Sequence, residues 1–166
     1  MTAIEFHVNQ DDKLLYACRL VRKAYRLGSN TVVTAEPQLL QQLDRLLWQF
    51  STTDFLPHCS SGSPAHTVAA SPILLTGHLD ACSPGAVLIN LGQSVASGFE
   101  RFERVIEVAS SQDEDRLAAR GRWKFYQQRG YALKSHEATV IEPKITEPNP
   151  TEPNITEPNI TEPSAI

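Results

Sequence analysis

The chain has 166 residues, of which 41% are hydrophobic, and it carries a formal net charge of −4 at pH 7. This length is enough for one domain with a buried core, and without a run of about 18 apolar residues the sequence predicts no membrane-spanning helix and no membrane partner. Residues 139–166 hold five glutamates and one lysine, so residues 1–138 keep 14 basic and 14 acidic side chains, which excludes a strongly basic domain.

The first part of the chain alternates predicted strands with predicted helices. Residues 3–8 alternate apolar and polar side chains, and residues 30–34 are rich in β-branched side chains, so both segments predict strands. Apolar residues at helical spacing predict helices over residues 11–27 and over residues 37–50. This β-α-β-α order predicts a parallel sheet with helices packed against it.

The second part adds three more predicted strands. Residues 72–76 and 86–91 are continuous apolar runs, which are typical of strands buried on both faces, and residues 105–108 predict the last strand. Residues 59–66 predict a Ser/Gly/Pro loop, and residues 97–102 a helical turn. We therefore predict an α/β fold with an open, mostly parallel, Rossmann-like sheet of about five strands flanked by helices.

The composition changes after Ala138. Glu-Pro recurs with a period of five residues, in TEPNP, TEPNI, TEPNI and TEPSA, and six of the 11 prolines lie in this part of the chain. Such a segment cannot form a regular helix or bury a core. We predict a folded domain over residues 1–138 and a disordered tail over residues 139–166.

The cysteines and the N-terminus indicate a cytoplasmic protein. Cys18, Cys59 and Cys82 are an odd number without C-x-x-C spacing, so we expect free thiols in a reducing compartment. The N-terminus has no basic segment followed by an apolar stretch, so we expect no secretory signal.

A basic helix is predicted over residues 112–129. Arg116, Arg120 and Lys124 are four residues apart and therefore share one face, with Trp123 beside them. Guanidinium and ammonium groups beside an indole suit an anion that also has an apolar part. The plain alternative is that this face is only solvated.

The ends of this helix carry capping signals. Ser111, followed three residues later by Glu114, predicts a capping box at the N-terminus. Gly130 suits a left-handed C-terminal cap.

The sequence contains little evidence for an enzyme. The sequence contains neither a G-x-x-x-x-G-K-[ST] nor a G-x-G-x-x-G phosphate loop, and no G-x-S-x-G nucleophile motif. His58, Cys59, His78 and Cys82 could together supply four metal ligands, but they lack a tight pair. We predict no catalysis, no cofactor and no metal; a small α/β enzyme or a nucleotide- or metal-binding domain is the alternative.

Trp48 and Phe55 have two possible roles. Trp48 ends a predicted helix, and Phe55 opens an extended piece seven residues later. They are either two core aromatics or an aromatic patch at the sheet edge, of the kind found at the centres of protein interfaces.

Four segments of the chain form a recognisable set: LDRLLW (43–48), DFLPH (54–58), VLINL (87–91) and RGRWKFYQQRGYAL (120–133). Together they resemble the chi subunit of bacterial DNA polymerase III, the accessory protein of the clamp-loader complex. The resemblance covers about Ile4 to Ala138 and omits the tail.

The resemblance implies a non-enzymatic adaptor in DNA replication. Its expected partners are the acidic, Phe-ending C-terminal tail of the single-stranded-DNA-binding protein, the psi subunit of the clamp loader, and in some cases a helicase on the psi surface. DNA itself would be bound only indirectly, because the folded part has no net positive charge.

The resemblance also implies roles for individual residues. Arg120 would pair with the terminal carboxylate of the tail, and Lys124 and Arg116 would face its aspartates. Val108 and Trp123 would form the pocket for the Phe ring. The aromatic contacts to psi or a helicase would come from Trp48 and Phe55.

Two departures from the family pattern affect these roles. Gln127 stands where relatives carry a further basic residue, so the basic stripe is shorter. An apparent extra residue near Ser110, before the basic helix, makes the assignment of Val108 less secure than that of Arg120.

Overall fold

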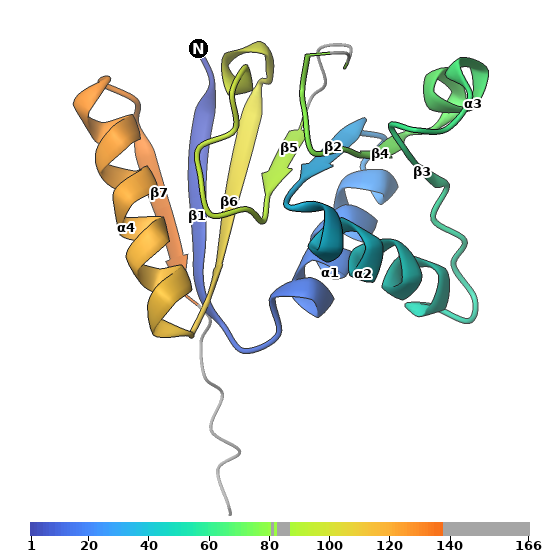
Figure 1. The fold of residues 1–166 in the computed structure, drawn as a ribbon, viewed down its shortest axis with the longest axis horizontal. Coiled ribbons are helices and arrows are strands. Elements are labelled where there is room, and N and C mark those ends of the chain that lie inside the picture. Colours follow the sequence, from blue (N-terminus) through green and yellow to red (C-terminus); the bar gives the residue numbers. More distant parts are fainter. Residues whose placement is uncertain (81, 83–86, 138–166) are drawn as a thin grey trace, which may run out of the picture.

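A parallel sheet runs through the computed structural model, which describes residues 1–80, 82 and 87–137 (Figure 1). The strands are β1 (Ala3–Gln10), β2 (Thr31–Thr34), β3 (His58–Ser60), β4 (Ile73–Leu75), β5 (Val87–Asn90), β6 (Arg104–Ser110) and β7 (Leu133–Glu137). Their order in space is β3-β4-β2-β5-β6-β1-β7, and every pair is parallel. The predicted open α/β fold is confirmed, with seven strands in place of about five.

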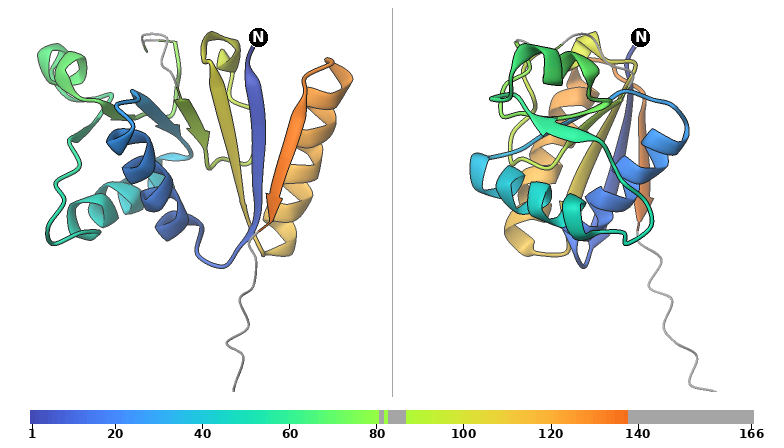
Figure 2. Two further views of the ribbon diagram at one scale, coloured as in Figure 1. Left: turned by 180° about the vertical axis from the view of Figure 1, so that it is seen from behind. Right: turned by 90° about the vertical axis from the view of Figure 1, so that its right-hand side faces the viewer.

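Helices cover both faces of this sheet (Figure 2). They are α1 (Lys13–Arg26), α2 (Pro37–Gln49), α3 (Ala65–Ala70) and α4 (Asp113–Gln128), with a 3-10 turn η1 (Phe99–Arg101). One apolar core lies between the sheet and α1 and α2, and a second lies on the other face, against α4 and η1. No helix among the described residues is long and apolar enough to cross a membrane.

Both strands that the sequence did not predict are edge strands. β7 has the sequence LKSHE, and four of its five residues are exposed, so it lacks the apolar alternation that signals a strand. β3 has only three residues. The predicted Ser/Gly/Pro loop over residues 59–66 was also partly wrong, because α3 begins directly after Pro64.

The N-terminus of α4 differs from the predicted capping box. β6 continues to Ser110, two residues beyond the predicted strand end, and the helix begins at Asp113 with Gln112 as an N-cap whose side chain makes no capping bond. Ser111 is therefore not the cap. At the other end Gly130 has a φ of +79°, as predicted for a left-handed cap. The proposed tail over residues 139–166 lies outside the described residues.

Candidate functional site

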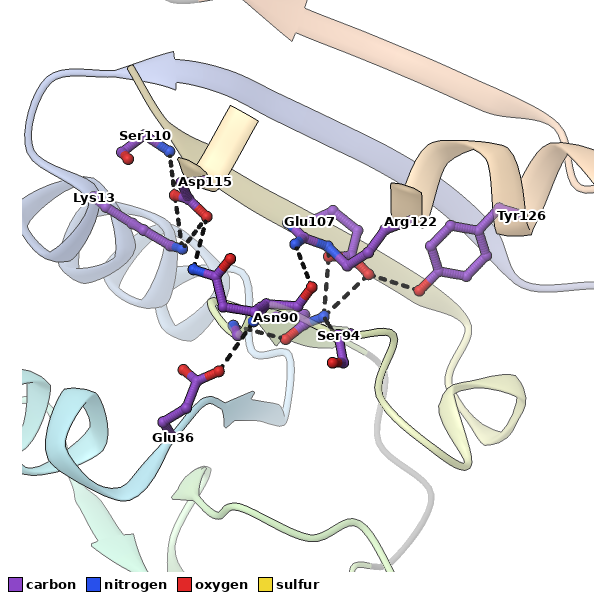
Figure 3. A network of polar contacts seen from close by, with 11 residues as sticks. Lys13, Glu36, Asn90, Ser94, Glu107, Ser110, Asp115, Arg122 and Tyr126 are labelled. Carbon is purple, nitrogen blue, oxygen red and sulfur yellow. Dashed lines mark hydrogen bonds and ion pairs between the residues drawn. The ribbon is translucent and has the colours of Figure 1, made fainter. Parts of the chain in front are cut away.

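A buried polar network fixes α4 against the sheet (Figure 3). The Glu107 carboxylate of β6 is fully buried and accepts a hydrogen bond from Arg122 Nε at 2.8 Å and one from the Tyr126 hydroxyl at 2.6 Å. Asn90 Nδ2 donates to the same carboxylate at 3.0 Å. Burial raises the pKa of Glu107, and the Arg122 guanidinium opposes that rise. Because Arg122 points inward, its neighbours Arg120 and Lys124 point outward.

A second polar contact fixes the first turn of α4 (Figure 3). The Asp115 carboxylate accepts a hydrogen bond from the Ser110 backbone N–H at 2.7 Å and forms an ion pair with Lys13 at 3.0 Å. Burial works to raise the pKa of Asp115, but the Ser110 N–H and the Lys13 ammonium outweigh it, and the pKa is lowered. Asp115 thus connects α4 with β6 and α1.

A hollow of about 200 Å³ lies between α4 and the strands β1 and β6. Its apolar lining comes from Phe6, Val8, Ala109 and Ala119, and its rim from Asn9, Arg116, Arg120, Trp123 and Glu137. The Trp123 ring packs edge-on against Phe6, with 5.0 Å between the ring centroids. The site therefore combines an apolar lining with two guanidinium groups and one carboxylate.

The structure brings together three of the five residues predicted for tail binding. Arg116, Arg120 and Trp123 line the hollow. Lys124 is exposed on the same helix but does not line it. Val108 does not line it either, because it is fully buried in the core on the α1 face. Side chains alternate along β6, so Ala109 takes the place that the resemblance gave to Val108.

Glu137 is the charged rim residue that the sequence did not indicate, and Asn9 is a second, uncharged one. Glu137 ends β7, an edge strand without an apolar pattern, so neither the strand nor its position beside α4 was expected. Parallel pairing of β7 with β1 brings it to the hollow.

The two rim arginines differ in how they are engaged. Arg116 lies 3.6 Å from the exposed carboxylate of Asp113. Within the described part of the chain, Arg120 makes no ion pair. A free guanidinium can hold a carboxylate with two parallel hydrogen bonds.

Trp48 and Phe55 form an exposed aromatic patch. The two residues are 58% and 65% exposed, and their ring centroids are 5.6 Å apart, so they are not core aromatics. The Trp48 ring also lies 4.8 Å from the ring of His58 in β3. The patch is therefore at the β3 edge of the sheet, and the hollow is near the β7 edge. These two edges lie at opposite ends of the sheet (Figure 1).

Two other candidate sites from the sequence are not supported. Among the described residues, His58, Cys59, His78 and Cys82 form no cluster with metal-ligand spacing, and the three cysteines are free thiols. A hollow of about 580 Å³ does lie at the carboxyl ends of the strands, where α/β folds often bind nucleotides. It is lined by five carboxylates and one ammonium group, which would repel a phosphate: Asp11, Asp12, Lys13, Glu36, Glu114 and Asp115.

Comparison with known proteins gives consistent matches. The profile of the family described as "DNA polymerase III chi subunit, HolC" matches residues 1–134. The DNA polymerase III subunit chi of Pseudomonas aeruginosa (strain PAO1) is 32% identical over 146 residues, which are 85% of this chain and 100% of that protein. The subunit of the same name from Haemophilus influenzae (strain Rd) is 26% identical over 120 residues, 72% of this chain and 83% of that protein.

Proposed function

We propose that this chain, which belongs to the family of DNA polymerase III chi subunits, is an adaptor that links the clamp loader to the single-stranded-DNA-binding protein. Family membership gives an accessory role in DNA replication. The finer proposal is that the chain binds the acidic, Phe-ending C-terminal tail of the single-stranded-DNA-binding protein and has no catalytic activity of its own. The observation that carries it is an apolar hollow next to the guanidinium of Arg120, which makes no ion pair with any of the described residues.

The hollow has room for the terminal ring. An engineered protein cavity of about 150 Å³ holds benzene, and the hollow here measures about 200 Å³. Burying a Phe side chain contributes roughly 1.5–3 kcal/mol. Arg120 lies on the rim of the same hollow. There it can bind the terminal carboxylate of the Phe residue whose ring occupies the hollow.

Arg116 and Lys124 lie one turn before and one turn after Arg120 on α4, and both are exposed. We propose that the acidic residues of the tail lie along this stripe. Exposed charge pairs contribute little each and are screened by salt, so most of the affinity should come from the ring and its carboxylate.

Glu137 should weaken the binding of an acidic peptide, because its carboxylate lies on the same rim. Glu137→Gln removes the repulsion and keeps the shape of the side chain, so we expect affinity to rise roughly twofold to fivefold at low salt. Titration calorimetry with a synthetic acidic peptide ending in Phe measures this. Glu100→Gln, an exposed acidic residue outside the hollow, is the control. Equal gains in both variants would assign the effect to net charge alone.

The Trp48/Phe55 patch is the proposed site for a psi subunit of the clamp loader or for a helicase. Exposed aromatic pairs of this kind are typical anchors of protein interfaces. Because the patch and the hollow lie near opposite edges of the sheet, both partners can bind at once. Contact with DNA would then come through the partners.

A pull-down with the wild-type chain, Trp48→Ala and Arg120→Ala tests the two surfaces separately. We expect Trp48→Ala to lose psi or helicase and to keep the single-stranded-DNA-binding protein, and we expect Arg120→Ala to do the reverse. The reason is that each change removes an exposed group at one edge of the sheet only. Loss of both partners in either variant would contradict two independent surfaces.

A further inference from the structure

A second group of ionisable side chains lies on the sheet face opposite the hollow. Side chains alternate along β1, so Phe6 and Val8 face α4, whereas Glu5 and His7 face the other way. β7 pairs with β1 in parallel and places His136 directly beside His7. The three ligand-type side chains on this face therefore come from two adjacent strands (Figure 1).

The distances within this group fit a metal ion. His7 Nε2 and His136 Nε2 each lie 3.6 Å from the same carboxylate oxygen, Glu5 Oε2. All three ligand atoms are within 4.8 Å of one another. A tetrahedral zinc ion with ligands at about 2.1 Å separates them by about 3.4 Å, so only a small movement of the exposed His136 ring would complete the set.

His7 gives independent support. It is only 8% exposed, and its Nε2 has no hydrogen-bond partner in the described part of the chain. A buried polar atom without a partner destabilises the fold, and a bound metal ion would remove that cost. Its Nδ1 lies 2.5 Å from the Tyr16 hydroxyl, which can accept a hydrogen bond from Nδ1–H and so orient the ring with the Nε2 lone pair toward Glu5.

We propose that Glu5, His7 and His136 bind one divalent transition-metal ion, with zinc as the expected ion. Two imidazoles and one carboxylate are a common ligand set for zinc, with the fourth position left to water. The His136 side chain is 53% exposed, so solvent can reach that position. The ion would hold the exposed edge strand β7 on β1.

Arg104 limits the affinity of this site. Its guanidinium binds the Glu5 carboxylate with two hydrogen bonds, at 3.0 Å to Oε1 and 2.6 Å to Oε2. A carboxylate has about four lone-pair positions, so Oε2 can accept from Arg104 and still bind a metal. The positive charge nevertheless opposes a cation, so Arg104→Gln should tighten metal binding.

Zinc titration of the untagged, chelator-treated full chain tests the proposal. Competition with a chromophoric chelator measures affinity and stoichiometry, and Co²⁺ as a substitute reports tetrahedral geometry by its visible absorption. We expect one ion per chain and a rise in the melting temperature with zinc. His136→Ala, which changes an exposed side chain, should weaken binding at least about tenfold.

His66→Ala is the matched control, because His66 is an exposed histidine outside the group. It should leave zinc affinity unchanged. Equal loss in His66→Ala and His136→Ala, or no change in His136→Ala, would overturn the site. Arg120→Ala should keep full zinc binding, so this inference stands or fails separately from the proposed peptide site.

Discussion

Replacing Arg122 with methionine should lower the free energy of unfolding by about 3–5 kcal/mol, because the change leaves the Glu107 carboxylate buried without its cation. Glu107 is fully buried and Arg122 is 2% exposed, so water cannot replace the lost partner. The Tyr126 hydroxyl and the Asn90 amide would still donate to the carboxylate, which keeps the cost below that of a wholly unpaired charge.

Urea unfolding of three variants separates the charge effect from the packing effect. Arg120→Met makes the same change at an exposed position two residues earlier and should shift stability by no more than about 0.5 kcal/mol. The double variant Glu107→Leu/Arg122→Met removes both charges and should recover part of the loss, because apolar replacements of buried ion pairs are often neutral, whereas the buried Tyr126 hydroxyl loses its acceptor. A double variant as unstable as Arg122→Met alone would show that shape and hydrogen bonding, and not the unpaired charge, cause the loss.

Arg120 is exposed and Arg122 is buried, and this difference shows what could and could not be predicted from the sequence. The buried positions of α4 are Asp115, Ala119, Arg122 and Tyr126, a regular helical stripe that includes two charged residues. From periodicity alone, the charged residues Asp115 and Arg122 would be predicted to face solvent. Only the position of Glu107, which faces α4 from β6, shows why Arg122 belongs in the core.

The predicted strands and helices were most accurate where burial produces a regular apolar pattern. β2, β4 and β5 are buried throughout, and each was predicted to within about two residues. β7 was missed because an exposed edge strand needs no apolar pattern. Without this strand, the positions of Glu137 and His136 in the sheet could not be predicted. Val108 was expected in the pocket but lies on the opposite face of the sheet from the hollow, because a shift of one residue along a strand moves a side chain to the other face.

Arg120→Ala should weaken binding of an acidic, Phe-ending peptide by about ten- to a hundredfold, which corresponds to roughly 1.5–3 kcal/mol. This magnitude is that of a charge-assisted hydrogen bond to a terminal carboxylate, made at the rim of an apolar hollow. Arg120 is the appropriate residue because, in the described part of the chain, it has no competing ion pair, whereas Arg116 has Asp113 at 3.6 Å.

Titration calorimetry at two salt concentrations measures this loss and identifies its source. Arg129→Ala is the control, because it removes the same charge at the end of α4, where Arg129 packs over the Phe125 ring and does not line the hollow. We expect Arg129→Ala to weaken peptide affinity by less than about threefold at low salt, and to leave it unchanged at high salt. The Arg120 effect should persist at high salt, since a carboxylate held in two hydrogen bonds beside a buried ring is poorly screened. If Arg120→Ala bound the peptide as tightly as Arg129→Ala, Arg120 would not hold the terminal carboxylate. The hollow would then recognise only the Phe ring.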